Sequence, residues 1–151
     1  MNGNAHSTAL DGRHRYAVRV YYEDTDAGGV AYHATYLRFA ERARTEALRD
    51  LGIPHAELLQ CFTLMFVVRR VEVDYLRPAR LDDRLTIITE PREVGGASVL
   101  LRQDVQGPEG PCAVLTVRLA CVAPGEARPR RLPPRWRSVL AAMQLAAHGA
   151  G

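Results

Sequence analysis

The chain has 151 residues, which is the size of one domain with a substantial hydrophobic core. Hydrophobic residues make up 47% of the sequence and charged residues 25%, and these proportions exclude a disordered polypeptide. Arginine supplies all 20 basic side chains, yet the formal net charge is only +3, so the composition does not predict a nucleic-acid-binding protein.

The cysteines and the N-terminal residues bear on the cellular compartment. Cys61, Cys112 and Cys121 form no C-x-x-C pair, so neither a disulfide framework nor a zinc site is predicted. The first residues lack the apolar core of a signal peptide, and no apolar run reaches the roughly 18 residues that a membrane span needs. We therefore expect a cytoplasmic protein without a membrane span and without a bound metal.

The first predicted elements are a strand, a turn and a long helix. Residues 17–23 alternate, with Val18, Val20 and Tyr22 on one face, as in a half-buried strand. The segment "DTDAGGV" then reverses the chain. Apolar residues recur at spacings of three and four over residues 33–52, which predicts an amphipathic helix. Its predicted stripe contains Tyr36, Leu37, Ala40, Ala43, Ala47, Leu48 and Leu51.

The rest of the chain is rich in β-forming residues. We expect a short apolar turn around "HAELLQ" and then four long strands over residues 62–76, 83–93, 97–106 and 112–123. Together with the first strand these predict an α+β fold in which a sheet of about five antiparallel strands curls around one long helix. We expect a flexible extension over residues 1–15, one domain over 16–134 and a tail over 135–151 that contains a short helix.

Acidic residues and glycines gather where the long helix is predicted to begin, near residues 30–34. The first N–H groups of a helix lack partners and its N-terminus carries partial positive charge, so the negatively charged form of Asp26 is favoured there. The backbone N–H of His33 could bind the oxygen of a substrate carbonyl as it becomes an oxyanion. Residues Gly28, Gly29, Val30 and Ala34 are expected to contact the substrate, because the glycines leave room near the backbone.

Simpler interpretations exist for each of these residues. Asp24 and Asp26 could cap the helix or form a turn, while His33 and Tyr22 could be structural. A calcium-binding EF-hand loop is excluded, because Gly28 and Thr35 stand where acidic ligands are required. A serine hydrolase is disfavoured, because Ser98 is not in a G-x-S-x-G motif. The grouping of Tyr22, Asp26 and His33 around one glycine turn favours a site for acyl transfer.

The segment "VRVYYEDTDAGGVAYHATYLRFAERARTEALRDLG" resembles the acyl-CoA thioesterases of the hotdog fold. The nearest group is the one associated with the Tol-Pal system, which is related to 4-hydroxybenzoyl-CoA thioesterases. The segments "VVRRVEVDYLRPARLDDRLTI" and "PRRLP" agree with the same group, and the resemblance covers about residues 16–134.

The resemblance implies a curved sheet wrapped around one helix, with subunits paired into dimers or tetramers and active sites at subunit interfaces. It implies hydrolysis of acyl-CoA without a further cofactor. The catalytic aspartate of the family falls on Asp26, as nucleophile or general base, its histidine on His33 and its tyrosine on Tyr22. The relatives carry basic residues for the phosphates of coenzyme A where this chain has Gly95, Gly96 and Ala97.

Two other functions stay open at this point. One is the hydration or dehydration of acyl thioesters, which other hotdog proteins perform. The other is the binding of an acyl carrier protein or another partner of lipid metabolism, since exposed arginines can meet acidic helices.

Overall fold

The computed structural model describes residues 6–8 and 11–148. Six antiparallel strands form one curved sheet in the order β1-β2-β4-β5-β6-β3. The strands are β1 (His6–Thr8), β2 (His14–Arg19), β3 (Met65–Tyr75), β4 (Arg84–Val94), β5 (Ser98–Gly107) and β6 (Gly110–Val122). The predicted α+β architecture is confirmed, with β1 as a short addition from the expected N-terminal extension. Residues 1–5 and 9–10 of that extension lie outside the described part of the chain.

The first predicted strand ends earlier than its alternating pattern suggests. The strand β2 stops at Arg19, and Tyr22–Asp24 form a short 3-10 helix, η1. The N–H of Val20 still donates a hydrogen bond of 2.9 Å to the carbonyl of Asp83 beside β4, whereas the N–H of Tyr21 donates to the carboxylate of Asp24 at 2.8 Å. The prediction that Tyr22 continues the strand was therefore wrong.

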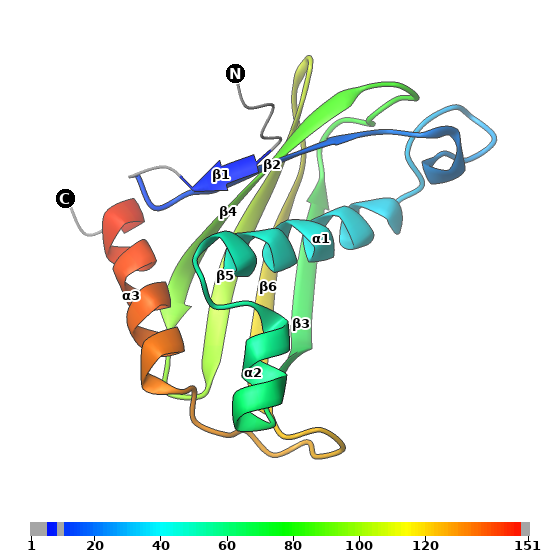
Figure 1. Ribbon diagram of the computed structural model, residues 1–151. Coiled ribbons are helices and arrows are strands. Elements are labelled where there is room, and N and C mark those ends of the chain that lie inside the picture. The colour runs from blue at the N-terminus through cyan, green and yellow to red at the C-terminus, as the bar shows by residue number, and fades with distance from the viewer. Residues whose placement is uncertain (1–5, 9–10, 149–151) are drawn as a thin grey trace.

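The helix α1 (Thr35–Asp50) lies across one face of the sheet (Figure 1), as predicted. Its buried face contains Phe39, Ala40, Ala43 and Ala47, and the small alanines let the helix backbone approach the strands closely. Leu37 was assigned to this face but is 39% exposed. After Leu51 the chain turns at Gly52, whose φ of +79° is available to glycine at little cost.

The side chain of Gln103 fixes α1 against the sheet. This buried amide donates hydrogen bonds of 2.9 Å to the carbonyl of Ala40 and 3.0 Å to the hydroxyl of Thr89. Its oxygen accepts a hydrogen bond of 3.1 Å from Arg44. The Gln103 amide, the Ala40 carbonyl, the Thr89 hydroxyl and the Arg44 guanidinium are therefore all hydrogen-bonded, as buried polar groups require.

Two further helices complete the fold. The segment predicted as an apolar turn forms α2 (His55–Phe62), which buries Leu58 and ends at Thr63 in the left-handed conformation. The helix α3 (Pro134–His148) packs beside β4 and buries Trp136, Leu140 and Met143. Among the described residues, no helix is long and apolar enough to cross a membrane.

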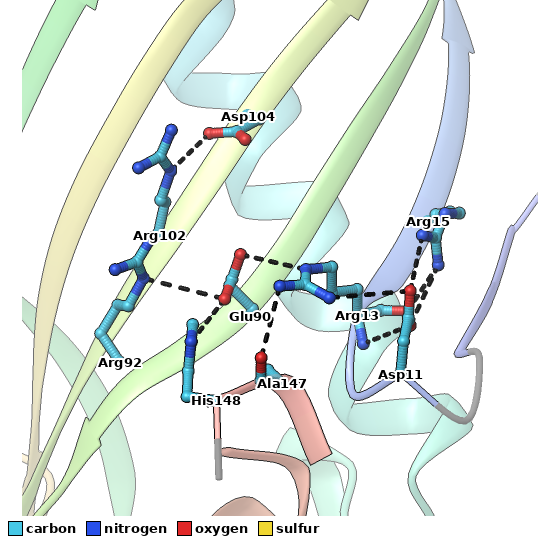
Figure 2. Close-up of polar contacts among 9 residues, drawn as sticks. All are labelled: Asp11, Arg13, Arg15, Glu90, Arg92, Arg102, Asp104, Ala147 and His148. Atoms are coloured by element: carbon cyan, nitrogen blue, oxygen red, sulfur yellow. Dashed lines mark hydrogen bonds and ion pairs between the residues drawn. The ribbon is translucent and has the colours of Figure 1, made fainter. Parts of the chain in front are cut away.

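A buried carboxylate joins both ends of the described chain to β4 (Figure 2). One oxygen of Glu90 lies 3.4 Å from the guanidinium of Arg13, and the other lies 2.5 Å from the imidazole of His148. Arg13 also donates to the carbonyl of Ala147, and Arg92 lies 3.7 Å from the same carboxylate. The cluster therefore holds α3 and the residues that precede β2 at one place on the sheet.

Candidate active site

The loop between β2 and α1 folds back on itself at the glycine pair. Thr25 and Ala31 face each other in an antiparallel bridge, and the N–H of Asp26 donates to the carbonyl of Val30 at 2.9 Å. Gly29, with a φ of +77°, donates to the carbonyl of Asp26 at 3.1 Å. The reversal predicted from "DTDAGGV" is thus a small hairpin with Asp26 at its base.

This hairpin is attached to the connection between β3 and β4. The N–H of Ala31 donates to the carbonyl of Ala79 at 2.7 Å, and Leu81 donates to the carbonyl of Gly29 at 3.2 Å. Val30 and Arg80 form a further antiparallel bridge between them. The position of the loop is therefore set by residues about 50 positions away in the sequence.

The two aspartates of the motif have different environments. Asp24 is buried, and its carboxylate accepts the N–H of Tyr21 at 2.8 Å and lies 3.6 Å from Arg38. Its carbonyl accepts hydrogen bonds from the N–H of Tyr32 and the hydroxyl of Thr35, both at 2.9 Å. Asp24 is therefore a structural residue that closes the loop, in agreement with the simpler interpretation.

Asp26 is exposed, and its carboxylate forms a hydrogen bond only within its own loop. One oxygen accepts the N–H of Gly28 at 2.8 Å. Its other oxygen makes no hydrogen bond to a described residue. In the single chain Asp26 therefore offers a carboxylate that is free to meet a ligand or a second copy.

The helix starts slightly later than predicted, at Thr35, after a turn in which Thr35 donates to the carbonyl of Tyr32 at 2.8 Å. Within the described chain, the backbone N–H groups of His33 and Ala34 donate to no acceptor. Unpaired N–H groups ahead of a helix are suited to bind a carbonyl oxygen that gains negative charge. The candidate oxyanion donor at His33 is therefore available.

An open hollow of about 300 Å³ is lined in part by His33. Its lining consists of Ala31, His33, Tyr36, Tyr75, Leu76, Arg77 and Pro78. The His33 and Tyr75 rings meet edge to face with their centroids 6.4 Å apart, and the Tyr75 hydroxyl donates to the His33 carbonyl at 3.1 Å. A volume of this size, apolar with a few polar groups, is at the lower end of the range for small-molecule sites.

The predicted residues are thus brought together only in part. His33 borders the hollow, whereas Asp26, Gly28, Gly29, Val30 and Ala34 are in the adjoining loop but do not line it. Tyr22 is 82% exposed, and its described hydrogen bonds use its backbone carbonyl, which accepts from Thr25. The catalytic roles assigned to Asp26, His33 and Tyr22 stay predictions.

Two tyrosines at the hollow were not identified from the sequence. Tyr75 ends β3, and Tyr36 is in the first turn of α1, with ring centroids 5.6 Å apart. Tyr36 accepts the N–H of Ala79 at 3.0 Å, which links α1 to the same connection that holds the hairpin. Burial raises the pKa of Tyr36, so its phenol stays neutral near pH 7. No local pattern distinguishes Tyr75 from other exposed strand residues.

Comparison with known proteins identifies the family. The model of the Thioesterase superfamily matches residues 28–113, a segment that begins at Gly28 within the hairpin and contains α1, β3, β4 and β5. The chain belongs to the Thioesterase superfamily.

Curated relatives in this superfamily match most of the chain. The acyl-CoA thioesterase YbgC of Haemophilus influenzae is 48% identical over 124 residues, which are 82% of this chain and 91% of the relative. The acyl-CoA thioester hydrolase YbgC of Escherichia coli O157:H7 is 47% identical over 79% of this chain and 89% of its own length. The predicted family is thereby confirmed.

Solved structures agree with this assignment. A probable thioesterase from Bartonella henselae is 40% identical, with a TM-score of 0.76 over 80% of this chain and 99% of that one. A DHNA-CoA thioesterase from Staphylococcus aureus has a TM-score of 0.83 over 91% of this chain and 94% of that chain. At 19% identity, it supports the fold alone.

Proposed function

We propose that this protein hydrolyses acyl-CoA thioesters to a free acid and coenzyme A. The thioesterase relatives support this reaction, and the observation that carries it is the unpaired N–H of His33 at the rim of a hollow, on the same loop as the carboxylate of Asp26. The reaction needs only water as a co-reactant, so no cofactor enters the proposal.

In the proposed reaction the thioester carbonyl oxygen accepts the N–H of His33 while the carbonyl carbon is attacked. If Asp26 is the base, it takes a proton from water, the oxygen of that water bonds to the carbon, and the bond from carbon to sulfur breaks. The proton then passes to the thiolate of coenzyme A. If Asp26 is the nucleophile, its oxygen forms a mixed anhydride that water hydrolyses. Both routes consume one water and release one acid and one thiol.

The variant Asp26→Asn tests this role, because it keeps the shape and removes the charge. We expect kcat for acyl-CoA to fall by roughly a hundredfold or more. Glu23→Gln is the matched control, since Glu23 is an exposed acid of the same loop. Unchanged thiol release by Asp26→Asn, with an unchanged Tm, would remove Asp26 from the mechanism.

We further propose that the protein acts as a homodimer or homotetramer in which β3 of one copy meets β3 of another. The strand β3 is at an edge of the sheet, and its side chains Val68, Val71 and Tyr75 are 50%, 38% and 50% exposed. An exposed apolar edge strand can pair with another chain. A second copy there would enclose the loop that carries Asp26. Light scattering on the purified protein distinguishes monomer, dimer and tetramer.

The proposed setting is the cytoplasm, where thiols stay reduced, in keeping with the free thiols of Cys61, Cys112 and Cys121.

An acyl carrier protein is proposed as a further partner, because it presents its acyl group as a thioester on an acidic surface that arginines can meet. Thiol release from acyl carrier protein and from acyl-CoA, measured side by side, tests this partner.

A further inference from the structure

Two spaces beneath α1 lie beyond the His33 hollow. The outer one is a pocket of about 320 Å³ between α1, α2 and the start of β3. Polar side chains of α1 and His55 border this pocket, and its apolar lining is Leu59, Met65, Phe66, Val68 and Leu119. The inner one is a chamber of about 20 Å³ between α1, α3 and the sheet. A chamber of this volume holds about one small group, such as a methyl group.

The pocket and the chamber are neighbours, because Arg44, Phe66 and Leu119 line both of them. The Phe66 ring meets the His55 ring of α2 edge to face, with their centroids 6.2 Å apart. Arg44 donates a hydrogen bond of 3.1 Å to the side-chain oxygen of Gln103. Its charge therefore has a polar partner, and its alkyl part can border an apolar chain.

The order of these spaces along α1 matches the length of an acyl chain. Tyr36 lines the hollow, Glu41 lines the pocket and Ala47 lines the chamber. From Tyr36 to Ala47 the helix rises about 16 Å, which is roughly the length of an extended dodecanoyl chain. A thioester carbonyl held at the hollow can therefore place the methyl end of such a chain at the chamber.

The helix α3 forms the far wall of the chamber, where the buried side chains of Leu140 and Met143 line it. The backbone behind Met143 is held by Gly12, which has a φ of +76°. A Cβ on Gly12 would overlap the carbonyl oxygen of Met143 and lie 2.6 Å from the backbone nitrogen of Ala147. Because this contact leaves no space behind the helix, the depth of the chamber is set by the Met143 side chain, which is apolar and flexible.

We propose that the chamber receives the methyl end of an unbranched, saturated acyl chain, and that Met143 limits the chain length. The proposal rests on the proposed function, which places the thioester carbonyl at the hollow. The polar side chains at the chamber, Arg44 and Thr89, are hydrogen-bonded to Gln103, so a hydrocarbon end fits there and a charged end does not. The wall that α3 supplies lies outside residues 28–113, the part of the chain that the family model matches.

The test measures kcat/KM for acyl-CoA thioesters of increasing chain length, each relative to octanoyl-CoA. Met143→Ala removes three heavy atoms from the wall and makes room for roughly two to three more carbons. We expect the relative value for tetradecanoyl-CoA to rise about tenfold, because these carbons become buried. Ala47→Val fills the chamber from the opposite side, so the relative value for dodecanoyl-CoA should fall about tenfold.

Two controls separate chain length from stability. Met143→Leu nearly conserves the side-chain volume and should keep the wild-type preference. Leu58→Ala removes a buried leucine of α2 that lines neither the pocket nor the chamber. It should lower Tm without changing the preference.

Direct binding separates this proposal from the reaction itself. With methionine methyl groups labelled with ¹³C, Met65 reports on the pocket and Met143 on the chamber. Octanoate should shift the NMR signal of Met65, whereas dodecanoate should shift both signals. If dodecanoate shifts both but no acyl-CoA releases thiol, the proposed function fails and the chamber proposal stands. A Met143 signal that dodecanoate does not shift, or an unchanged chain-length preference in Met143→Ala, would overturn the chamber proposal.

Discussion

The hydroxyl of Tyr75 donates a hydrogen bond of 3.1 Å to the backbone carbonyl of His33, and so ties the end of the edge strand to the turn before α1. This carbonyl belongs to the same peptide group as the N–H of Ala34. A hydrogen bond at the oxygen of a peptide group polarises its N–H and strengthens it as a donor. Tyr75 is therefore a positioning residue for the turn that carries the N–H groups of His33 and Ala34.

The variant Tyr75→Phe keeps the ring and removes this hydrogen bond. We expect kcat for acyl-CoA to fall about threefold to tenfold, since one neutral hydrogen bond contributes roughly 0.5–1.5 kcal/mol. Tyr21→Phe serves as the control, because Tyr21 is 61% exposed. Steady-state thiol release measures both. Equal kcat in the two variants would show that the contact does not influence the reaction.

The variant Asp24→Asn should act on stability. It leaves the N–H of Tyr21 with a weaker acceptor and removes the charge that faces Arg38. We expect the free energy of unfolding to fall by about 1–3 kcal/mol, measured by urea denaturation. Glu23→Gln should stay within about 0.5 kcal/mol of the wild type. A similar small effect of both variants would argue against a structural role for Asp24.

The Glu90 cluster of Figure 2 predicts a further loss of stability. Glu90→Gln removes the negative charge that faces Arg13, Arg92 and His148 and leaves the two arginines close together without it. We expect unfolding to become easier by about 1–3 kcal/mol. The control is Glu72→Gln, which breaks the exposed pair with Arg70 and should cost less than about 1 kcal/mol. The reverse order of the two losses would contradict this role of the cluster.

His55 predicts how stability depends on pH. Burial lowers the pKa of His55 below its ordinary value, and the nearby charge of Arg44 lowers it further. The unfolded chain therefore binds a proton at a higher pH than the folded chain does. As pH falls through about 6.5, the unfolded state gains this proton first and stability decreases. Urea denaturation between pH 7 and pH 5 should show that decrease, and His55→Gln should reduce it.

Local patterns predicted the sheet, α1 and the glycine turn, because each depends on periodicity or on residues within a few positions. They failed where contacts outside the alternating pattern decide the structure. Residues 20–23 continue the alternation of β2, but the N–H of Tyr21 donates to the carboxylate of Asp24 and Tyr22–Asp24 form a 3-10 helix. The segment "HAELLQ" is short enough to suggest a turn, yet burial of Leu58 makes it a helix.

The candidate site shows the same difference between residues that a local pattern identifies and contacts that only the fold creates. The cluster around Asp26 and His33 was visible because both residues are on one short loop. The hydrogen bond of Tyr75 to His33 spans 42 residues. It leaves no local signal, so it required the folded structure.

The attachment of the Asp26 hairpin to residues 79–81 has a practical consequence for directed evolution. The position of the loop is set by residues 79–81, which do not line the hollow. Libraries that vary the side chains of this connection, while leaving the loop intact, can shift the loop by small steps. Variants with faster or more selective turnover are therefore expected at positions outside the lining of the hollow, which a screen of lining residues would omit.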